Sequence, residues 1–233
     1  MLVGTRNPLN LGAAVRAMSN FGFCHLRVVN PWDAAFREAR SAIGAAGLLA
    51  KAEEYKSVAE AVADCRLVVG TSAVGRRELQ HPLRRLEEGA RLIRRQLKAG
   101  RVALLFGSEK VGLSNHDLSH CHWIMRIPTR EEHRSMNLGQ AVALCLYELV
   151  RQGRAGGKTE RKIRPHAGDL ERITRLLYRV LDASGYVKPR VAAATEEKVR
   201  RMVWRLELDA RDAELWLGML RQIAWKLGAK GSI

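Results

Sequence analysis

An arginine in the first helical stretch of this sequence stands where it could do chemistry. Arg16 lies among small and apolar residues in NPLNLGAAVRAMSNFG (residues 7–22), where a long cationic side chain has little reason to be packed. Arginine stays protonated at ordinary pH, so it orients a substrate or stabilises negative charge more easily than it accepts a proton. We therefore expect Arg16 to project into a reactive site. The structural alternative is a salt bridge to a carboxylate such as Glu109.

Three further segments rich in glycine, serine and threonine follow apolar runs that are typical of strands. Ligands collect at the carboxyl ends of parallel strands, so we expect these loops to form one binding site. The middle loop resembles a phosphate-binding P-loop only in part. Leu113 stands where that motif requires lysine, which disfavours a nucleotide-hydrolysing enzyme. The segments are GTSAVG (70–75), FGSEKVGLSN (106–115) and IPTREEHRSMN (127–137).

A short run of histidine and cysteine raises the question of a metal site. His116, His120, Cys121 and His122 lie close together, but no second ligand group has helical or zinc-knuckle spacing elsewhere. In a strand, Cys121 and His122 would also face opposite sides of the sheet. The four cysteines show no C-x-x-C spacing, which argues against zinc and against a disulfide framework. We expect no metal, and reduced cysteines that are mostly buried.

The elements that must position these loops alternate along residues 1–150. Short runs rich in β-branched residues predict strands, and the stretches between them have helical periodicity or composition. This alternation predicts an α/β domain with a largely parallel sheet. Strands are expected at 24–30, 65–72, 101–107 and 122–128, and helices at 31–52, 58–64 and 82–99.

The remainder of the chain has a different organisation. Residues 151–168 combine glycines with six basic residues and one acidic residue, which is typical of a flexible, positively charged linker. Residues 169–233 carry apolar residues at three- and four-residue spacing, which predicts a small all-α appendage of about three helices. Its Trp204, Trp216 and Trp225 could stack on bases, but filling the apolar faces of these helices is the simpler expectation.

The net charge of +16 is unevenly distributed along the chain. Residues 151–233 hold 19 Lys/Arg against 10 Asp/Glu. Each phosphate contact releases counterions, so we assign this excess to nucleic-acid docking rather than to solubility alone. No apolar run reaches the roughly 18 to 20 residues of a membrane span, and the N-terminus lacks a signal-peptide pattern. We therefore expect a cytoplasmic protein without membrane contact.

Three motifs follow one another in a specific order: N-x-G-x-x-x-R (10–16), F-G-S-E-x-x-G-L (106–113), and I-P followed by S-M-N-L-G-Q-A-V (127–142). This ordered set resembles the SpoU branch of the SPOUT RNA 2′-O-ribose methyltransferases over residues 1 to about 150. The basic linker and the final helices resemble, more loosely, the tail of the TrmJ-like subgroup. That subgroup methylates tRNA at the 5′ edge of the anticodon loop, which implies position 32. In the family a full strand precedes the first motif, whereas only Met1 to Val3 precede Gly4 here, so we expect either a start upstream of Met1 or a shortened first strand.

The resemblance implies an S-adenosylmethionine-dependent tRNA 2′-O-methyltransferase that needs no metal. It implies a SPOUT-type parallel sheet with a C-terminal trefoil knot, and a homodimer whose site draws on both subunits. The helix at 138–150 offers more apolar surface than one core side needs, which favours it as the dimer contact. The alternatives are a ribosomal RNA target, and a SPOUT protein that binds RNA without catalysis.

The resemblance also implies roles for individual residues. Arg16 would activate the ribose 2′-hydroxyl, Ser135 or Asn137 would orient the ribose or Arg16, and Glu109 completes the catalytic set. The structural alternative for Ser135 and Asn137 is capping of the helix that follows them. The residues implied to bind the cofactor are Thr71, Ser72, Ala73, Gly107, Ile127, Arg134, Ser135 and Met136.

Overall fold

The chain builds a parallel sheet from two groups of strands. The computed structural model describes residues 1–31, 46–73, 81–151 and 163–229. In spatial order, the first group is β1 (Leu2–Val3), β2 (Arg27–Val29) and β3 (Glu53–Tyr55). The second group, also in spatial order, is β5 (Leu83–Arg85), β7 (Trp123–Arg126), β4 (Leu67–Thr71) and β6 (Val102–Leu105). Every pairing among these strands is parallel. The groups meet where the N–H of Val3 donates to the carbonyl of Phe106 at 2.8 Å, so β1 lies beside the end of β6.

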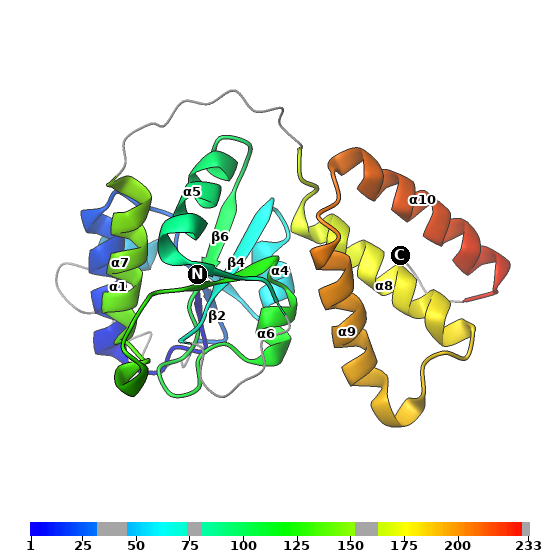
Figure 1. The fold of residues 1–233 in the computed structure, drawn as a ribbon, viewed down its shortest axis with the longest axis horizontal. Coiled ribbons are helices and arrows are strands. Elements are labelled where there is room, and N and C mark those ends of the chain that lie inside the picture. Colours follow the sequence, from blue (N-terminus) through cyan, green and yellow to red (C-terminus); the bar gives the residue numbers. More distant parts are fainter. Residues whose placement is uncertain (32–45, 74–80, 152–162, 230–233) are drawn as a thin grey trace.

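Helices of the first 150 residues cover both faces of this sheet (Figure 1). One face carries α1 (Pro8–Asn20), α3 (Ala46–Ala50), α5 (Leu86–Leu97) and α7 (Leu138–Val150), whose apolar side chains share a core with Val69 and Met125. The other face carries α4 (Val58–Val62) and α6 (Asn115–Ser119), which share a core with Val68 and Ile124. Neighbouring residues of β4 thus point to opposite faces, as the period of two along a strand requires. The predicted α/β domain with a parallel sheet is confirmed.

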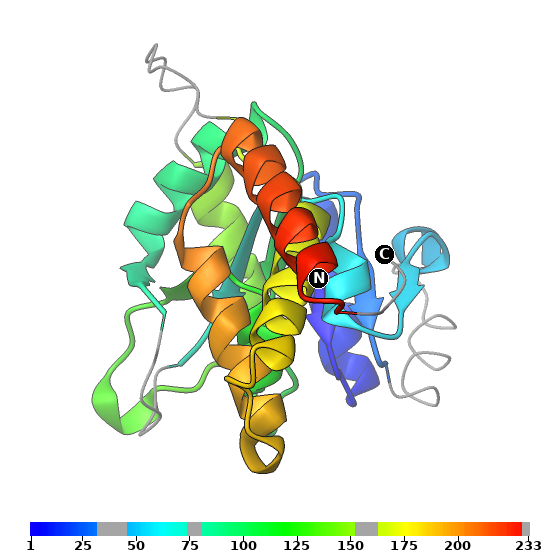
Figure 2. The same cartoon turned by 90° about the vertical axis from the view of Figure 1, so that its right-hand side faces the viewer.

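The C-terminal helices also pack on the face of the sheet that carries α4 and α6. They are α8 (Ala167–Ala183), α9 (Ala192–Arg205) and α10 (Ala210–Lys226), with the 3-10 turn η2 (Pro189–Val191) before α9. Ile173 and Trp204 from these helices are buried in the same core as Ile124 of the sheet. The start of α8 is bonded directly to the sheet domain, because the N–H of Ala167 donates to the carbonyl of Cys65 at 2.7 Å. Figure 2 shows α8, α9 and α10 lying together across this side of the molecule.

The strands expected from the sequence are all present as β2, β4, β6 and β7. Before Gly4 the structure has the two-residue strand β1, and the strands β3 and β5 were not predicted from the sequence. The helix expected over 82–99 is wrong at its start, because Leu83–Arg85 form β5 and α5 begins at Leu86. Pairing with β7 overrides the helical composition there, and the N–H of Ile124 donates to the carbonyl of Pro82 at 2.9 Å.

Several expectations concern segments that are described only in part. Most of the helix expected at 31–52 and most of the linker at 151–168 lie outside the described residues. The trefoil knot and the division at residues 150 and 168 stay predictions.

Packing of the tryptophans is confirmed for Trp204, which is buried, and for Trp216, which is partly buried, but it is wrong for Trp225, which is 74% exposed.

Candidate active site

A cavity of about 380 Å³ opens at the carboxyl ends of β4, β6 and β7. Its walls are the three loops singled out in the sequence. Glu109 lines it, whereas Arg16 and Asn137 do not. A second cavity of about 310 Å³ lies at the amino ends of β1, β2 and β6, and no predicted site residue lines it. Every residue expected to bind the cofactor lines the first cavity: Thr71, Ser72, Ala73, Gly107, Ile127, Arg134, Ser135 and Met136.

A glycine allows the second loop to fold tightly beside this cavity. The N–H of Gly112 donates to the carbonyl of Ser108 at 2.8 Å, and Gly112 adopts a left-handed φ of +70°. A Cβ atom on Gly107 would lie 2.1 Å from the carbonyl carbon of Gly112, so only glycine fits there. Leu113 is buried in the core shared with β4, which makes it a packing residue at the position where a P-loop has lysine.

Hydrogen bonds tie the walls of the cavity to the strands. The hydroxyl of Thr71 donates to the carbonyl of Leu105 at 2.8 Å, and the N–H of Ser72 donates to the carbonyl of Met125 at 3.1 Å. The third loop contains the 3-10 turn η1 (Glu131–His133), and the hydroxyl of Thr129 donates to the carbonyl of Arg134 across it at 3.3 Å. These hydrogen bonds tie the first loop to β6 and β7 and close the third loop.

A chain of side-chain hydrogen bonds joins the three motifs. The amide nitrogen Nδ2 of Asn10 donates to Oε1 of Glu109 at 3.2 Å, and Nδ2 of Asn137 donates to Oδ1 of Asn10 at 2.7 Å. Oδ1 of Asn137 accepts the N–H of Gly139 at 2.9 Å and so caps α7. Asn137 therefore caps α7, as the structural alternative expected, and also takes part in the hydrogen-bond network. Asn10 was not among the predicted site residues, although it is the first residue of the first motif.

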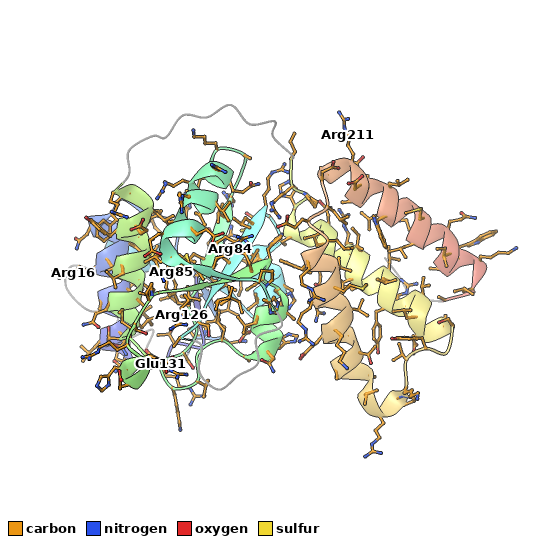
Figure 3. All side chains as sticks on the ribbon, viewed as in Figure 1. Arg16, Arg84, Arg85, Arg126, Glu131 and Arg211 are labelled. Carbon is orange, nitrogen blue, oxygen red and sulfur yellow. The ribbon has the colours of Figure 1, made fainter. Side chains whose placement is uncertain are left out.

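Arg16 lies apart from the other predicted catalytic residues. It projects from the exposed side of α1 at the edge of the molecule (Figure 3). It makes no hydrogen bond or ion pair with any residue in the described ranges, so the alternative of a salt bridge to Glu109 is wrong. The oxygens of Glu109 instead accept from Asn10 and, at 3.4 Å, from the N–H of Arg6. Ser135 is exposed where it lines the cavity.

The sequence profile of the SpoU rRNA Methylase family matches residues 1–147, which hold the three loops and α1. This chain belongs to the SpoU family. The match covers the whole sheet and every predicted site residue.

Relatives of this SpoU family member extend over nearly its full length. The tRNA (cytidine/uridine-2'-O-)-methyltransferase TrmJ of Sodalis glossinidius is 34% identical over 229 residues, covering 96% of this chain and 89% of the relative. The protein of the same name from Yersinia pestis (strain Pestoides F) is 35% identical over 231 residues, covering 96% and 90%. The crystal structure of TrmJ from Z. mobilis ZM4 superposes with a TM-score of 0.82 at 31% identity, covering 95% of this chain and 96% of that one.

Buried histidines lie where the C-terminal helices of this SpoU protein meet the sheet. Burial lowers the pKa of His81 to about 4 and the pKa values of His120 and His122 to about 3. Nδ1 of His122 accepts the N–H of Val68 at 3.1 Å, and its ring contacts Trp204 with centroids 4.9 Å apart. We call His81, His120 and His122 the interface histidines. They are neutral packing groups of the folded protein at neutral pH.

The histidine and cysteine run does not assemble into a metal site. Within the part of the chain that the structure describes, no group of three or more His, Cys, Asp or Glu residues is arranged to hold a metal ion. Cys121 is buried in the core shared with β4, whereas His116 is exposed. The helices within those same ranges are all too short or too polar to cross a lipid bilayer.

Proposed function

We propose that this protein transfers the methyl group of S-adenosylmethionine to a ribose 2′-hydroxyl of tRNA, at position 32 of the anticodon loop. One observation carries the proposal: residues of the second and third SpoU motifs line one cavity at the carboxyl edge of the sheet, and Asn10 of the first motif is hydrogen-bonded to both of these motifs. Relatives that bear the name of a tRNA (cytidine/uridine-2'-O-)-methyltransferase align with 96% of the chain, including the C-terminal helices. A tRNA substrate fits a cytoplasmic location.

The cavity suits the methyl donor in size and chemistry. It is large enough for a small molecule at about 380 Å³, and close backbone approach at Gly107 leaves room beside the loop that a side chain would fill. When bound, the sulfonium supplies an activated methyl group. Residues 71–73, Gly107, Ile127 and 134–136 would hold the donor by backbone and short polar groups. The protein's remaining task is to orient the weakly nucleophilic hydroxyl in line with the methyl group and to assist loss of its proton.

Arg16 would perform that task from a second copy of the chain. Its guanidinium is exposed and does not line the cavity of its own protomer, which supports a site shared across a dimer. Beside it, α7 exposes apolar side chains at Leu144, Tyr147 and Val150, with exposed fractions of 40%, 50% and 44%. We propose that α1 and α7 form this homodimer contact. Light scattering should give twice the mass of the chain at micromolar concentration, and a monomer would contradict the shared site.

The reaction is tested by incubating the protein with labelled methyl donor and separate pools of tRNA and ribosomal RNA. Label on the ribose of nucleotide 32 of tRNA is expected. Label only on ribosomal RNA would favour the other target, and donor binding without transfer would favour an RNA-binding protein without catalysis. Arg16→Ala should nearly abolish transfer while donor affinity stays within a few fold, and Arg16→Lys should also fail because lysine lacks the planar fork. Arg95→Ala, at an exposed arginine of α5 outside the cavity, is the matched control.

A further inference from the structure

Two arginines face each other at the edge of the sheet beside the cavity. Arg85 ends β5 and Arg126 ends β7, and the two are register partners in a parallel pair. Side chains of register partners point to the same face, and Figure 3 shows these two next to each other. Like charges directly opposite one another destabilise a sheet. A bound anion would therefore stabilise this pair of arginines by neutralising their charge.

The described residues of the protein neutralise little of the charge on Arg85 and Arg126. Arg126 is half-buried and forms no hydrogen bond or ion pair with any residue whose position is described. Arg85 has one loose contact, 3.6 Å to a carboxylate oxygen of Glu87, and its side chain is 72% exposed. Arg84, one residue earlier, differs because it pairs with Glu88 and lies over the ring of Trp123 at 5.8 Å. Packing accounts for Arg84 but not for its neighbour or for Arg126.

Nearby carboxylates on the third loop are engaged elsewhere. Glu131 lies 3.5 Å from Arg134, and Glu132 lies 4.0 Å from Arg130. Figure 3 places Glu131 on the loop, separate from the pair. Among the described residues, the carboxylates therefore leave Arg126 unpaired and Arg85 only loosely paired, which suits binding of an anion from outside the chain.

The position of the pair indicates which partner. Arg126 directly precedes Ile127, which lines the cavity, so both arginines stand at the carboxyl edge of the sheet where the reacting ribose must enter. We propose that Arg85 and Arg126 together bind one backbone phosphate of the RNA substrate, next to the nucleotide whose ribose enters the cavity. This rests on the proposed function. Guanidinium groups suit phosphate oxygens because they offer planar paired donors.

The test compares the wild-type protein with Arg85→Ala, Arg126→Ala and the double variant, using full-length chains and unmodified tRNA. Binding is measured between 50 and 200 mM salt. Loss of one phosphate contact should make the slope of log affinity against log salt shallower by about 0.7 to 0.9, which corresponds to roughly five- to eightfold weaker binding at 0.1 M salt. The double variant should show this full loss. Each single variant should show part of it, and the two effects should not multiply, because both arginines hold the same phosphate.

Three controls make the result decisive. Arg95→Ala removes an exposed arginine of α5, a helix that does not line the cavity, and should leave the salt slope almost unchanged. Calorimetry should give the double variant wild-type affinity for S-adenosylmethionine, because the pair is assigned to RNA and not to the donor carboxylate. Its melting temperature without RNA should stay level or rise, since one repulsive pair is gone.

A wild-type salt slope in the double variant overturns the proposal. So does an equal loss of donor affinity, or a melting temperature lowered by several degrees, which would indicate a structural role. The binding experiment does not depend on turnover. If the proposed function is wrong, the wild-type protein will not transfer the methyl group to tRNA, and this is seen in the separate methyl-transfer assay.

Discussion

Replacing Trp204 by alanine should show that the C-terminal helices and the sheet unfold as one unit. The indole of Trp204 is 1% exposed and contacts His122 and His120 with ring centroids 4.9 and 6.0 Å away. It therefore fills the junction between α9 and the start of β7. Removing a fully buried indole costs about 3–5 kcal/mol through lost burial and the cavity that remains. That is a large part of the roughly 5–15 kcal/mol that stabilises a typical domain.

The assay is urea unfolding followed by far-ultraviolet circular dichroism and, in parallel, by binding of S-adenosylmethionine. Both signals should move together to lower urea in Trp204→Ala, because His122 bonds to Val68 on β4, the strand that ends at the cavity in Thr71. Trp204→Phe keeps part of the packing and should lose less stability. Trp225→Ala removes the same side chain from a 74% exposed position and should change stability by less than about 0.5 kcal/mol.

Two results would refute this reasoning. One is a Trp204→Ala protein within about 1 kcal/mol of wild type, which would mean that the shared core contributes little. The other is a first transition that melts only the C-terminal helices while donor binding persists. If neither result occurs, removal of residues 151–233 would uncover the apolar face formed by Val62, Leu118 and Ile124. The predicted role of the tail in RNA docking is therefore better tested with point variants of the full chain.

Three further outcomes are expected. Between pH 6.5 and about pH 4 the interface histidines should bind protons in the unfolded chain but stay neutral in the folded protein, because burial lowers the pKa of each one. The free energy of unfolding, measured by urea titrations, should therefore fall as pH falls, by up to about 1.4 kcal/mol per pH unit for each histidine, and a pH-independent value would contradict their burial as neutral groups. Gly107→Ala should abolish donor binding in calorimetry because the added Cβ meets backbone, whereas Gly218→Ala, which meets nothing within 4 Å, should bind normally. Asn10→Ala should lower kcat/KM for tRNA about tenfold or more with donor affinity retained, because Glu109 loses a hydrogen-bond donor; equal losses in both would contradict a positioning role.

Local residue types by themselves determined the outline of the site. Glycine, serine and threonine after apolar runs predicted the loops that line the cavity, and Gly107 sits where backbone approaches too closely for any side chain. The alternation of strand and helix patterns predicted the parallel sheet. Such features are readable because they depend on backbone preferences and burial within a few neighbouring residues.

Tertiary structure decided what depends on distant contacts. Pairing with β7 made a strand of Leu83–Arg85 in a stretch of helical composition, and the same register brought Arg85 opposite Arg126. The fold also placed Asn10 between Glu109 and Asn137, and it left Arg16 outside the cavity. Strand register, hydrogen bonds between remote loops and the choice of which tryptophan is buried are set by packing across the whole chain, and no local pattern encodes them.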